Sequence, residues 1–396
     1  MKILFLRLAL VCLILIIFTC KKPYSPTIVS SNQAYLVVEG VINSGTDSTV
    51  ITLSRSVKLT GNVNSPETGA KVMVESDKKD QFTLTETVPG SYVIVGLNLP
   101  TDRNYRLHIF TSKNKEYVSD YVENKITPPI DSVYPKPLAT GVQFYVSSHD
   151  TKSKTRYYRW QYGEEWSYIL NEGANPSILI YRNGQILPRN PDSLINECYK
   201  SAVPSNNIFL ASSDKLSQDV IYQAPLGYVD GSTGKITNTY SLLVKEYALT
   251  ADAYKYWTLL KANTEQLGTI TDPQPSSSLT NLHSVTNPQE PVIGYVSVST
   301  IAIKRIFLYG RTLPFAVNEH STDTVSCEGG TIPVNPANTL DYRLRQTLAS
   351  GDSILIAPVR NMAGVIIGYS YTQPLCADCR TRGGTNIRPA YWPDLF

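Results

Sequence analysis

The sequence is poor in the residue types that build most catalytic and metal centres. Its four histidines are far apart, and none has a metal-ligating neighbour at helical spacing: His108, His149, His283 and His320. It contains no nucleophile elbow, zinc-protease helix, Walker loop or dinucleotide fingerprint. Glu164 and Glu165 would face opposite ways on a strand, so we expect both to be solvated. We therefore predict no enzyme, no cofactor and no metal, while a site assembled from distant strands stays open as an alternative.

The chain also lacks an excess of either charge. It has 36 basic and 33 acidic residues, and removal of an amino-terminal signal would take away Lys2 and Arg7 but no acid. A nearly neutral chain gives no reason to expect nucleic acid or a strongly acidic surface as partner.

No apolar run is long enough to cross a bilayer, which takes about 20 residues in a helix. The longest run, Leu8 to Phe18, contains one polar-capable residue, Cys12, and follows the basic residues Lys2 and Arg7. A basic start, a short apolar stretch and an abrupt polar switch indicate a secretory signal peptide over residues 1–19.

Cys20 stands at that polar switch, and Lys21, Lys22 and Pro23 follow it. This arrangement resembles a bacterial lipoprotein signal, in which the cysteine is acylated, for example with palmitate, and the chain is cut before it. The large Phe18 departs from the small residues that the pattern prefers, and a plain secretory signal with a chance cysteine is the alternative. We expect residues 20–34 to be a lipidated cysteine and its tether, which anchors the chain permanently in a membrane.

Four further cysteines lie in the mature chain: Cys198, Cys327, Cys376 and Cys379. An even number in an oxidising compartment indicates disulfides, with three possible pairings. Cys376 and Cys379 have the spacing of a redox dithiol or half a zinc site, but the sequence offers neither a second such pair nor a nearby histidine. We expect at least one of these two to be bonded. Cys198 and Cys327 are the favoured partners, and a local Cys376–Cys379 bond is the main rival.

Short alternating runs indicate that the fold is mostly β. Between residues 35 and 127, apolar and polar residues alternate, as at Val72 and Val74, and turn residues such as Pro89-Gly90 separate the runs. This spacing predicts an N-terminal β-sandwich of Ig-like or transthyretin-like type.

A larger β-rich domain is expected over residues 131–396, after a stiff linker at Thr127-Pro128-Pro129. One helix should begin after Thr250 and carry an apolar stripe made of Ala253, Tyr256, Trp257, Leu260 and Leu267. A second, shorter helix is expected near Leu340, Leu344 and Leu348.

Aromatic and basic residues mix from Arg156 to Tyr162, and the chain has 26 tyrosines. Such a mixture can stack bases or sugars, but we interpret it as the outward face of a strand, since tyrosine packs its ring while its hydroxyl stays wet.

Several strings together resemble a family of outer-membrane lipoproteins from Bacteroidota, the domain of unknown function 4249. They are Cys20-Lys21-Lys22-Pro23-Tyr24, Leu36-Val37-Val38-Glu39-Gly40, Pro128-Pro129-Ile130-Asp131-Ser132, Tyr256-Trp257, Asn287 to Tyr295, Cys376 to Arg380, Gly383 to Asn386 and Tyr391-Trp392-Pro393. The resemblance spans essentially the whole mature chain and implies an outer-membrane location. It carries no catalytic residue. Lys21 and Lys22 stand where surface-displayed relatives tend to have acids, so both faces of the membrane stay open.

Proteins of this kind are often encoded beside TonB-dependent transporters. The leading hypothesis is therefore a non-catalytic outer-membrane lipoprotein, anchored through Cys20, that serves such a transporter as an accessory or ligand-binding partner. The alternatives are an envelope hydrolase acting on polysaccharide or peptide, and a structural or adhesion module.

Overall fold

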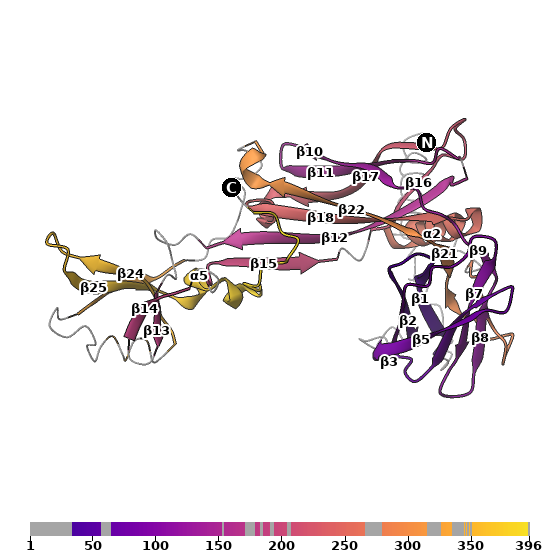
Figure 1. Cartoon of the computed structure of the whole chain (residues 1–396), viewed down its shortest axis with the longest axis horizontal. Coiled ribbons are helices and arrows are strands. Elements are labelled where there is room, and N and C mark those ends of the chain that lie inside the picture. Colours follow the sequence, from indigo (N-terminus) through magenta and orange to yellow (C-terminus); the bar gives the residue numbers. More distant parts are fainter. Residues whose placement is uncertain are drawn as a thin grey trace, which may run out of the picture.

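The computed structural model describes the following residues: 34–56, 65–152, 154–170, 179–182, 185–190, 194–203, 207–265, 279–314, 326–334, 344, 346, 348 and 351–394. They form an elongated molecule that is built almost entirely from strands, which confirms the mostly β prediction (Figure 1). We distinguish an N-terminal sandwich, a central sandwich and a distal module, each with its own hydrophobic core. In the described part of the chain, no helix is long and apolar enough to span a membrane.

The N-terminal sandwich is one connected sheet that bends over its own core. β5 pairs with β4 through its first half and with β6 through its second half, so it passes from one layer to the other. The first nine strands are β1 (Leu36–Asn43), β2 (Ser48–Arg55), β3 (Ser65–Pro66), β4 (Lys71–Ser76), β5 (Gln81–Val88), β6 (Ser91–Val95), β7 (Asn104–Phe110), β8 (Glu116–Ser119) and β9 (Val122–Glu123). The alternation seen in the sequence sets the register, because Val72 and Val74 pair with Ile109 and Leu107, and all four are buried.

Three strands from much later in the chain complete this sandwich. They are β19 (Leu282–Ser284), β20 (Ile293–Gly294) and β21 (Ser297–Ser299); β19 pairs with β8, and the other two run parallel to β1. Val292, Val296 and Val298 belong to the same buried core as Leu36. The expected boundary at residue 131 therefore needs correction, because this later segment was assigned to the C-terminal domain. Sequence order alone gives no sign that a chain will return to an earlier sheet.

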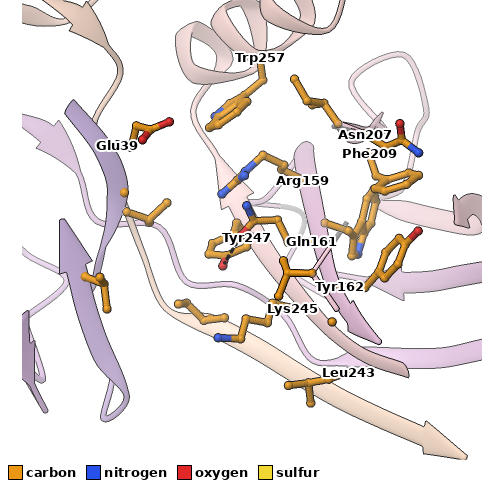
Figure 2. A pocket seen from close by; sticks show the side chains of 18 of the residues that line it. Glu39, Arg159, Gln161, Tyr162, Asn207, Phe209, Leu243, Lys245, Tyr247 and Trp257 are labelled. Carbon is orange, nitrogen blue, oxygen red and sulfur yellow. Dashed lines mark hydrogen bonds between the residues drawn. The ribbon is translucent and has the colours of Figure 1, made fainter. Parts of the chain in front are cut away.

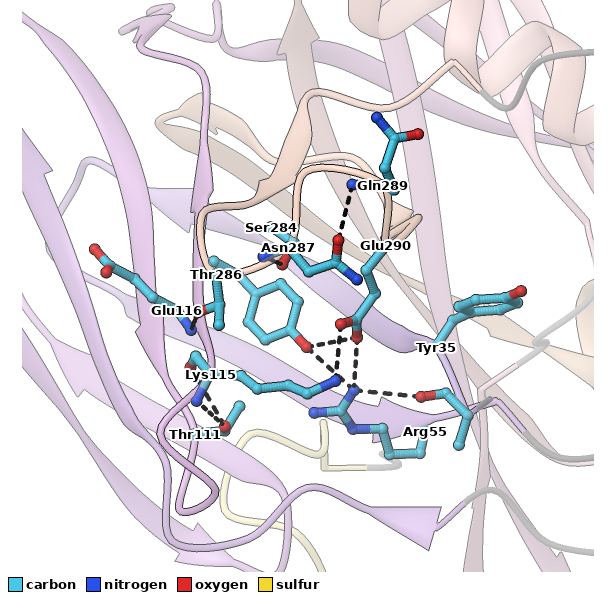
Figure 3. A network of polar contacts seen from close by, with 12 residues as sticks. Tyr35, Arg55, Thr111, Lys115, Glu116, Ser284, Thr286, Asn287, Gln289 and Glu290 are labelled. Carbon is cyan, nitrogen blue, oxygen red and sulfur yellow. Dashed lines mark hydrogen bonds and ion pairs between the residues drawn. The ribbon is translucent and has the colours of Figure 1, made fainter. Parts of the chain in front are cut away.

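Glu290 fixes the returning segment to the sandwich through buried charge-assisted contacts (Figure 3). Its carboxylate accepts a hydrogen bond from the Tyr117 hydroxyl at 2.7 Å and from Lys115 Nζ at 2.8 Å. Arg55 lies 3.6 Å from the same carboxylate and pairs with Glu67 on its other side. Only 7% of the Glu290 side chain is exposed, so these contacts hold its pKa below the usual range against the opposing effect of burial. The string Asn287 to Tyr295 therefore has a structural role here.

The central sandwich packs two sheets around a core rich in aromatic residues. Its strands are β10 (Ile130–Pro137), β11 (Gly141–His149) and β17 (Val220–Asp230) in one sheet, and β12 (Tyr157–Ile169), β15 (Glu197–Ala202), β16 (Phe209–Ser212), β18 (Thr239–Leu249) and β22 (Ile301–Tyr309) in the other. The expected linker is not separate from it, because Ile130 already begins β10 and Pro128 is buried.

The expected long helix is present as α2 (Ala251–Glu265), and it covers one end of the central sandwich beside the N-terminal sandwich (Figure 1). The Thr250 hydroxyl accepts a hydrogen bond from the Ala253 amide, so Thr250 caps the helix as expected. Ala253 and Trp257 pack toward β18, whereas the expected stripe residue Leu267 lies outside the described residues. Of the second expected helix, Leu344 and Leu348 have helical backbone and Leu340 is not described.

The distal module combines an inserted hairpin with the last strands of the chain. It contains β13 (Leu179–Arg182), β14 (Gln185–Pro188), β23 (Gly329–Pro333), β24 (Ile354–Arg360) and β25 (Ile366–Thr372). After it come α5 (Pro374–Ala377) and the 3-10 turn Cys379–Arg382 in the tail. Two further 3-10 turns, Gly231–Thr233 and Gly310–Thr312, belong to the central sandwich.

Two disulfides tie the end of the chain down. Cys379 bonds to Cys198 on β15, and Cys376 bonds to Cys327 just before β23. Both cysteines of the tail are bonded, and their partners are the two that the sequence favoured; the local Cys376–Cys379 bond does not form. Backbone hydrogen bonds between Tyr199 and Thr385 continue the attachment, so the tail lies along β15.

Two sequence interpretations of β12 need correction. The run from Arg156 to Tyr162 is not an outward face, because Tyr158 and Trp160 lie in the core and Arg159 is buried on the opposite face. Glu164 is not solvated: it is buried, accepts a hydrogen bond from the Tyr240 hydroxyl at 2.8 Å and pairs with Lys235 at 2.9 Å. Both strand faces are covered at these positions, which the alternation of polar and apolar residues did not show.

Candidate functional site: an aromatic groove between two sandwiches

A groove of about 1150 Å³ separates the N-terminal sandwich from the central one. β1 forms one wall, the outer face of β12 and β18 forms the other, and α2 closes one end (Figure 2). A volume of this size is in the range of small-molecule sites, which often lie between domains. Seven of the 28 residues that line the groove are aromatic, among them Phe209, Tyr247, Tyr256, Trp257 and Tyr295.

Strand register builds the central wall of this groove. Because side chains alternate along a strand, Arg159, Gln161 and Gly163 of β12 share one face. They pair with Tyr247, Lys245 and Leu243 of β18, respectively. The wall therefore has a regular order, with a cationic aromatic end beside α2, a polar middle and an open apolar end at Gly163. A side-chain carbon added at Gly163 would meet no atom within 4 Å, so the groove is empty above it.

Arg159 is the most unusual residue of the groove. Its guanidinium lies between the rings of Trp257 and Tyr247, at 4.1 Å and 4.4 Å from the ring centroids (Figure 2). Only 4% of the residue is exposed, and Nε has no hydrogen-bond partner. Among the described residues, no carboxylate forms an ion pair with it. Burial lowers the pKa of the Arg159 guanidinium to about 10, so it still carries its charge at neutral pH.

Energetics set this arginine apart from the other buried charges. Leaving a charged group buried without a counterion costs several kcal/mol, and stacking on a desolvated aromatic ring returns about 2 kcal/mol or more per ring. The neighbouring acids do not offset the difference, because Glu164 is paired with Lys235, and Glu165 with Arg305 and Tyr391. The groove therefore presents one buried cation, held among aromatic side chains and without an ion pair to any residue that the structure describes, while the exposed Glu39 stands on the opposite wall.

The middle of the wall adds further polar groups. The Tyr247 hydroxyl donates a hydrogen bond to Gln161 Oε1 at 3.0 Å, which leaves the Gln161 amide group facing the groove. Lys245 lines the groove beside it. Glu39 enters from β1 on the opposite wall and is exposed (Figure 2). The site can thus bind and orient a ligand through stacking, one buried cation and a few hydrogen bonds.

A second polar cluster lies in the core of the central sandwich, away from this groove. Glu246 is fully buried and accepts hydrogen bonds from Ser148 Oγ at 2.8 Å and Trp160 Nε1 at 2.7 Å. Nearby, Asp219 accepts from Tyr158 at 2.7 Å and from Ser213. Burial raises the pKa of Glu246 to about 7, with Asp131 and Asp219 adding to the rise. Because the carboxyls point into a packed core, we assign this cluster to stability.

The histidines are distributed as single residues. His108 is packed between Glu75 and Glu116, at 2.9 Å and 2.8 Å. His149 and His283 pair with Asp131 and Asp120 at the surface, and His320 lies outside the described residues. In the described part of the chain, no three metal-ligating side chains come together.

Of the site residues expected from the sequence, Cys20 lies outside the described residues, and the four other cysteines are structural disulfides. Sequence reasoning included Arg159 in the aromatic and basic run but assigned that run to an outward strand face, so it did not single out Arg159 as a site residue. The available signal was the alternation within Arg156 to Tyr162, which puts Arg159 on the face opposite Tyr158 and Trp160. That signal alone could not show that α2 and β1 would cover this second face.

The chain matches one family model over a stretch that includes the groove. The family model described as "Domain of unknown function (DUF4249)" matches residues 21–305. This chain belongs to that family. The DUF4249 match contains β1, β12, β18 and α2, and so includes every wall of the groove. It ends inside β22, so the resemblance of the carboxyl-terminal strings lies beyond the matched residues.

No curated protein sequence matches the chain. Among solved structures, a two-domain fibronectin type-III segment of chicken tenascin aligns at 11% identity, covering 53% of this chain and 89% of that one, with a TM-score of 0.16. The Yersinia pseudotuberculosis adhesin InvE aligns at 14% identity over 54% of this chain and 55% of that one, with a TM-score of 0.15. Likenesses this weak carry no argument about function.

Proposed function

We propose that this DUF4249 protein is a non-catalytic, lipid-anchored binding protein of the outer membrane that presents a ligand to, or accepts one from, a TonB-dependent transporter. The observation that carries the proposal is the aromatic groove between the two sandwiches, with a buried, unpaired arginine in its wall. A rigid β scaffold with a preformed pocket suits binding, since little ordering is needed when a ligand enters.

The anchor half of the proposal rests on Cys20. We expect Cys20→Ser to leave the protein in the soluble fraction or with its signal uncleaved, because no acyl chain then holds it. Fractionation and intact-mass measurement check this, and Cys12→Ser is the matched control, since it keeps the residue at the polar switch. A wild-type mature protein that begins after residue 20 without added acyl mass would contradict the anchor.

The partner half is tested by isolation in mild detergent. We expect a β-barrel transporter to co-purify in stoichiometric amount with the wild-type protein, and the association to survive washing with salt. The competing hydrolase hypothesis predicts a monomer that turns over a glycan or peptide substrate. A monomer with such turnover would end the proposal, and a monomer without turnover would remove the transporter from it.

A further inference from the structure

The chemistry of Arg159 specifies what kind of ligand the groove accepts. Trp257 and Tyr247 cover the two faces of the guanidinium, as Figure 2 shows. The N–H groups of a guanidinium lie in its plane, so stacking leaves the donor edge free while blocking the faces. A planar group with two acceptor oxygens matches such an edge, because it can form two parallel hydrogen bonds at once.

We propose that the groove binds a carboxylate on the edge of Arg159, carried by a ligand whose flat or apolar part rests on the aromatic lining. A planar carboxylate fits one stacked guanidinium, whereas a phosphoryl group carries more charge and usually meets several cations. The next cation in this groove is Lys245. It pairs with Gln161, which lies two residues along β12 from Arg159. The inference rests on the proposed binding role of the groove and adds the ligand class to it.

The position of Gly163 fits the same ligand. It lies on the same strand face as Arg159, four residues away, where the groove is open. Four residues of strand span about 13 Å. The ligand that fills this length is therefore larger than its carboxylate, and its body lies over Gln161 and Gly163. A carboxylate-terminated peptide and a uronic-acid-containing glycan both satisfy this description.

The test compares probes that differ only in the charge of one group. The mature full chain is titrated with N-acetylphenylalanine and with N-acetylphenylalanine amide, and binding is followed by tryptophan fluorescence, since Trp257 stacks on the site. We expect the carboxylate to bind at least tenfold more tightly than the amide, because a charge-assisted pair is lost in the amide. Galacturonate and inorganic phosphate are titrated alongside to separate a sugar acid and a phosphoryl group from a peptide carboxylate.

Three variants of groove residues and one control variant outside the groove make the result specific to the groove. Arg159→Met should abolish the preference for carboxylate and raise the melting temperature, because it removes an unpaired buried charge. Arg159→Lys keeps the charge without the planar fork and should lose most of the preference while folding normally. Gly163→Phe should weaken binding of all groove ligands with Arg159 intact, because its ring fills open space; Thr85→Phe, on an exposed position of β5 outside the groove, should bind as the wild type does.

Equal binding of the acid and the amide would overturn the inference, and so would carboxylate binding that survives both Arg159 substitutions. Phosphate binding without carboxylate binding would also overturn it. A lower melting temperature in Arg159→Met with no probe bound by the wild type would assign Arg159 to structure alone. These measurements need no transporter, so failure of co-purification and failure of carboxylate binding are separate results.

Discussion

Replacing Cys198 and Cys379 together with alanine should lower the free energy of unfolding by about 2–5 kcal/mol. The bond joins residues 181 positions apart, so its loss restores a large amount of conformational freedom to the unfolded chain. Both cysteines are fully buried, and alanine avoids leaving a hydroxyl without a partner there. Denaturant unfolding of the oxidised protein measures the change.

The second disulfide supplies the matched control. Cys327 and Cys376 are separated by 49 residues, so the same double substitution there should cost about 1 kcal/mol less on loop-closure grounds. The two variants should also differ in which part of the chain exchanges its amide hydrogens faster. Hydrogen exchange should rise in the tail around Thr385 only when the Cys198 bond is missing, since that bond holds the tail against β15. Equal exchange in both variants would contradict this assignment.

Glu246 should make the protein less stable as the pH rises from about 4.5 to about 7. Its pKa is about 7 in the folded protein, against 4.5 as the ordinary value, and burial is the main cause. Between these values the folded state holds a proton that the unfolded state has lost, so the free energy of unfolding falls with increasing pH. Below the window the contribution is complete, and above it the contribution is lost. The change is on the order of 3 kcal/mol.

Glu246→Gln should remove this fall. A glutamine can still accept from Trp160 and donate to Ser148, so the hydrogen bonds of the site are preserved without the ionisation. Denaturant unfolding at pH 4.5, 5.5, 6.5 and 7.5 measures the difference between variant and wild type. The matched control is Glu328→Gln, which changes an exposed carboxyl outside the groove and should keep the wild-type slope. If the free energy of unfolding changes with pH in the same way in wild type and in Glu246→Gln, Glu246 does not titrate in this window.

The strands were predictable because their signal is local. Alternation at Val72 and Val74 and turn residues at Pro89-Gly90 depend on neighbours within a few positions, and the structure has strands where that signal is present. The Thr250 cap was readable for the same reason. What the sequence did not contain locally was long-range pairing. β19 pairs with a strand about 160 residues earlier, and β20 and β21 pair with one about 260 residues earlier. Their short apolar runs are equally compatible with any sheet.

The groove was hidden for a related reason. Arg159 is unusual only because the rings of Trp257 and Tyr247 stack on its guanidinium and β1 faces it from a separate module. Each of these residues is ordinary in its own segment. The same holds for Glu164, whose burial depends on Lys235 and Tyr240. Covering of both faces of a strand is a property of tertiary packing, which period-two alternation does not report.

The late return of β19 to β21 governs the order in which the chain can fold. Until residues 282–299 have been synthesised, β1 has β2 on one side and an unpaired edge on the other. An open edge with a hydrophobic core beneath it invites pairing with other chains, and contacts between such distant residues form slowly. The amino-terminal sandwich is therefore the first to begin folding, but its sheet is completed only after β21 has been made. Any fragment that ends before residue 299 should aggregate even though it contains all of residues 35–127.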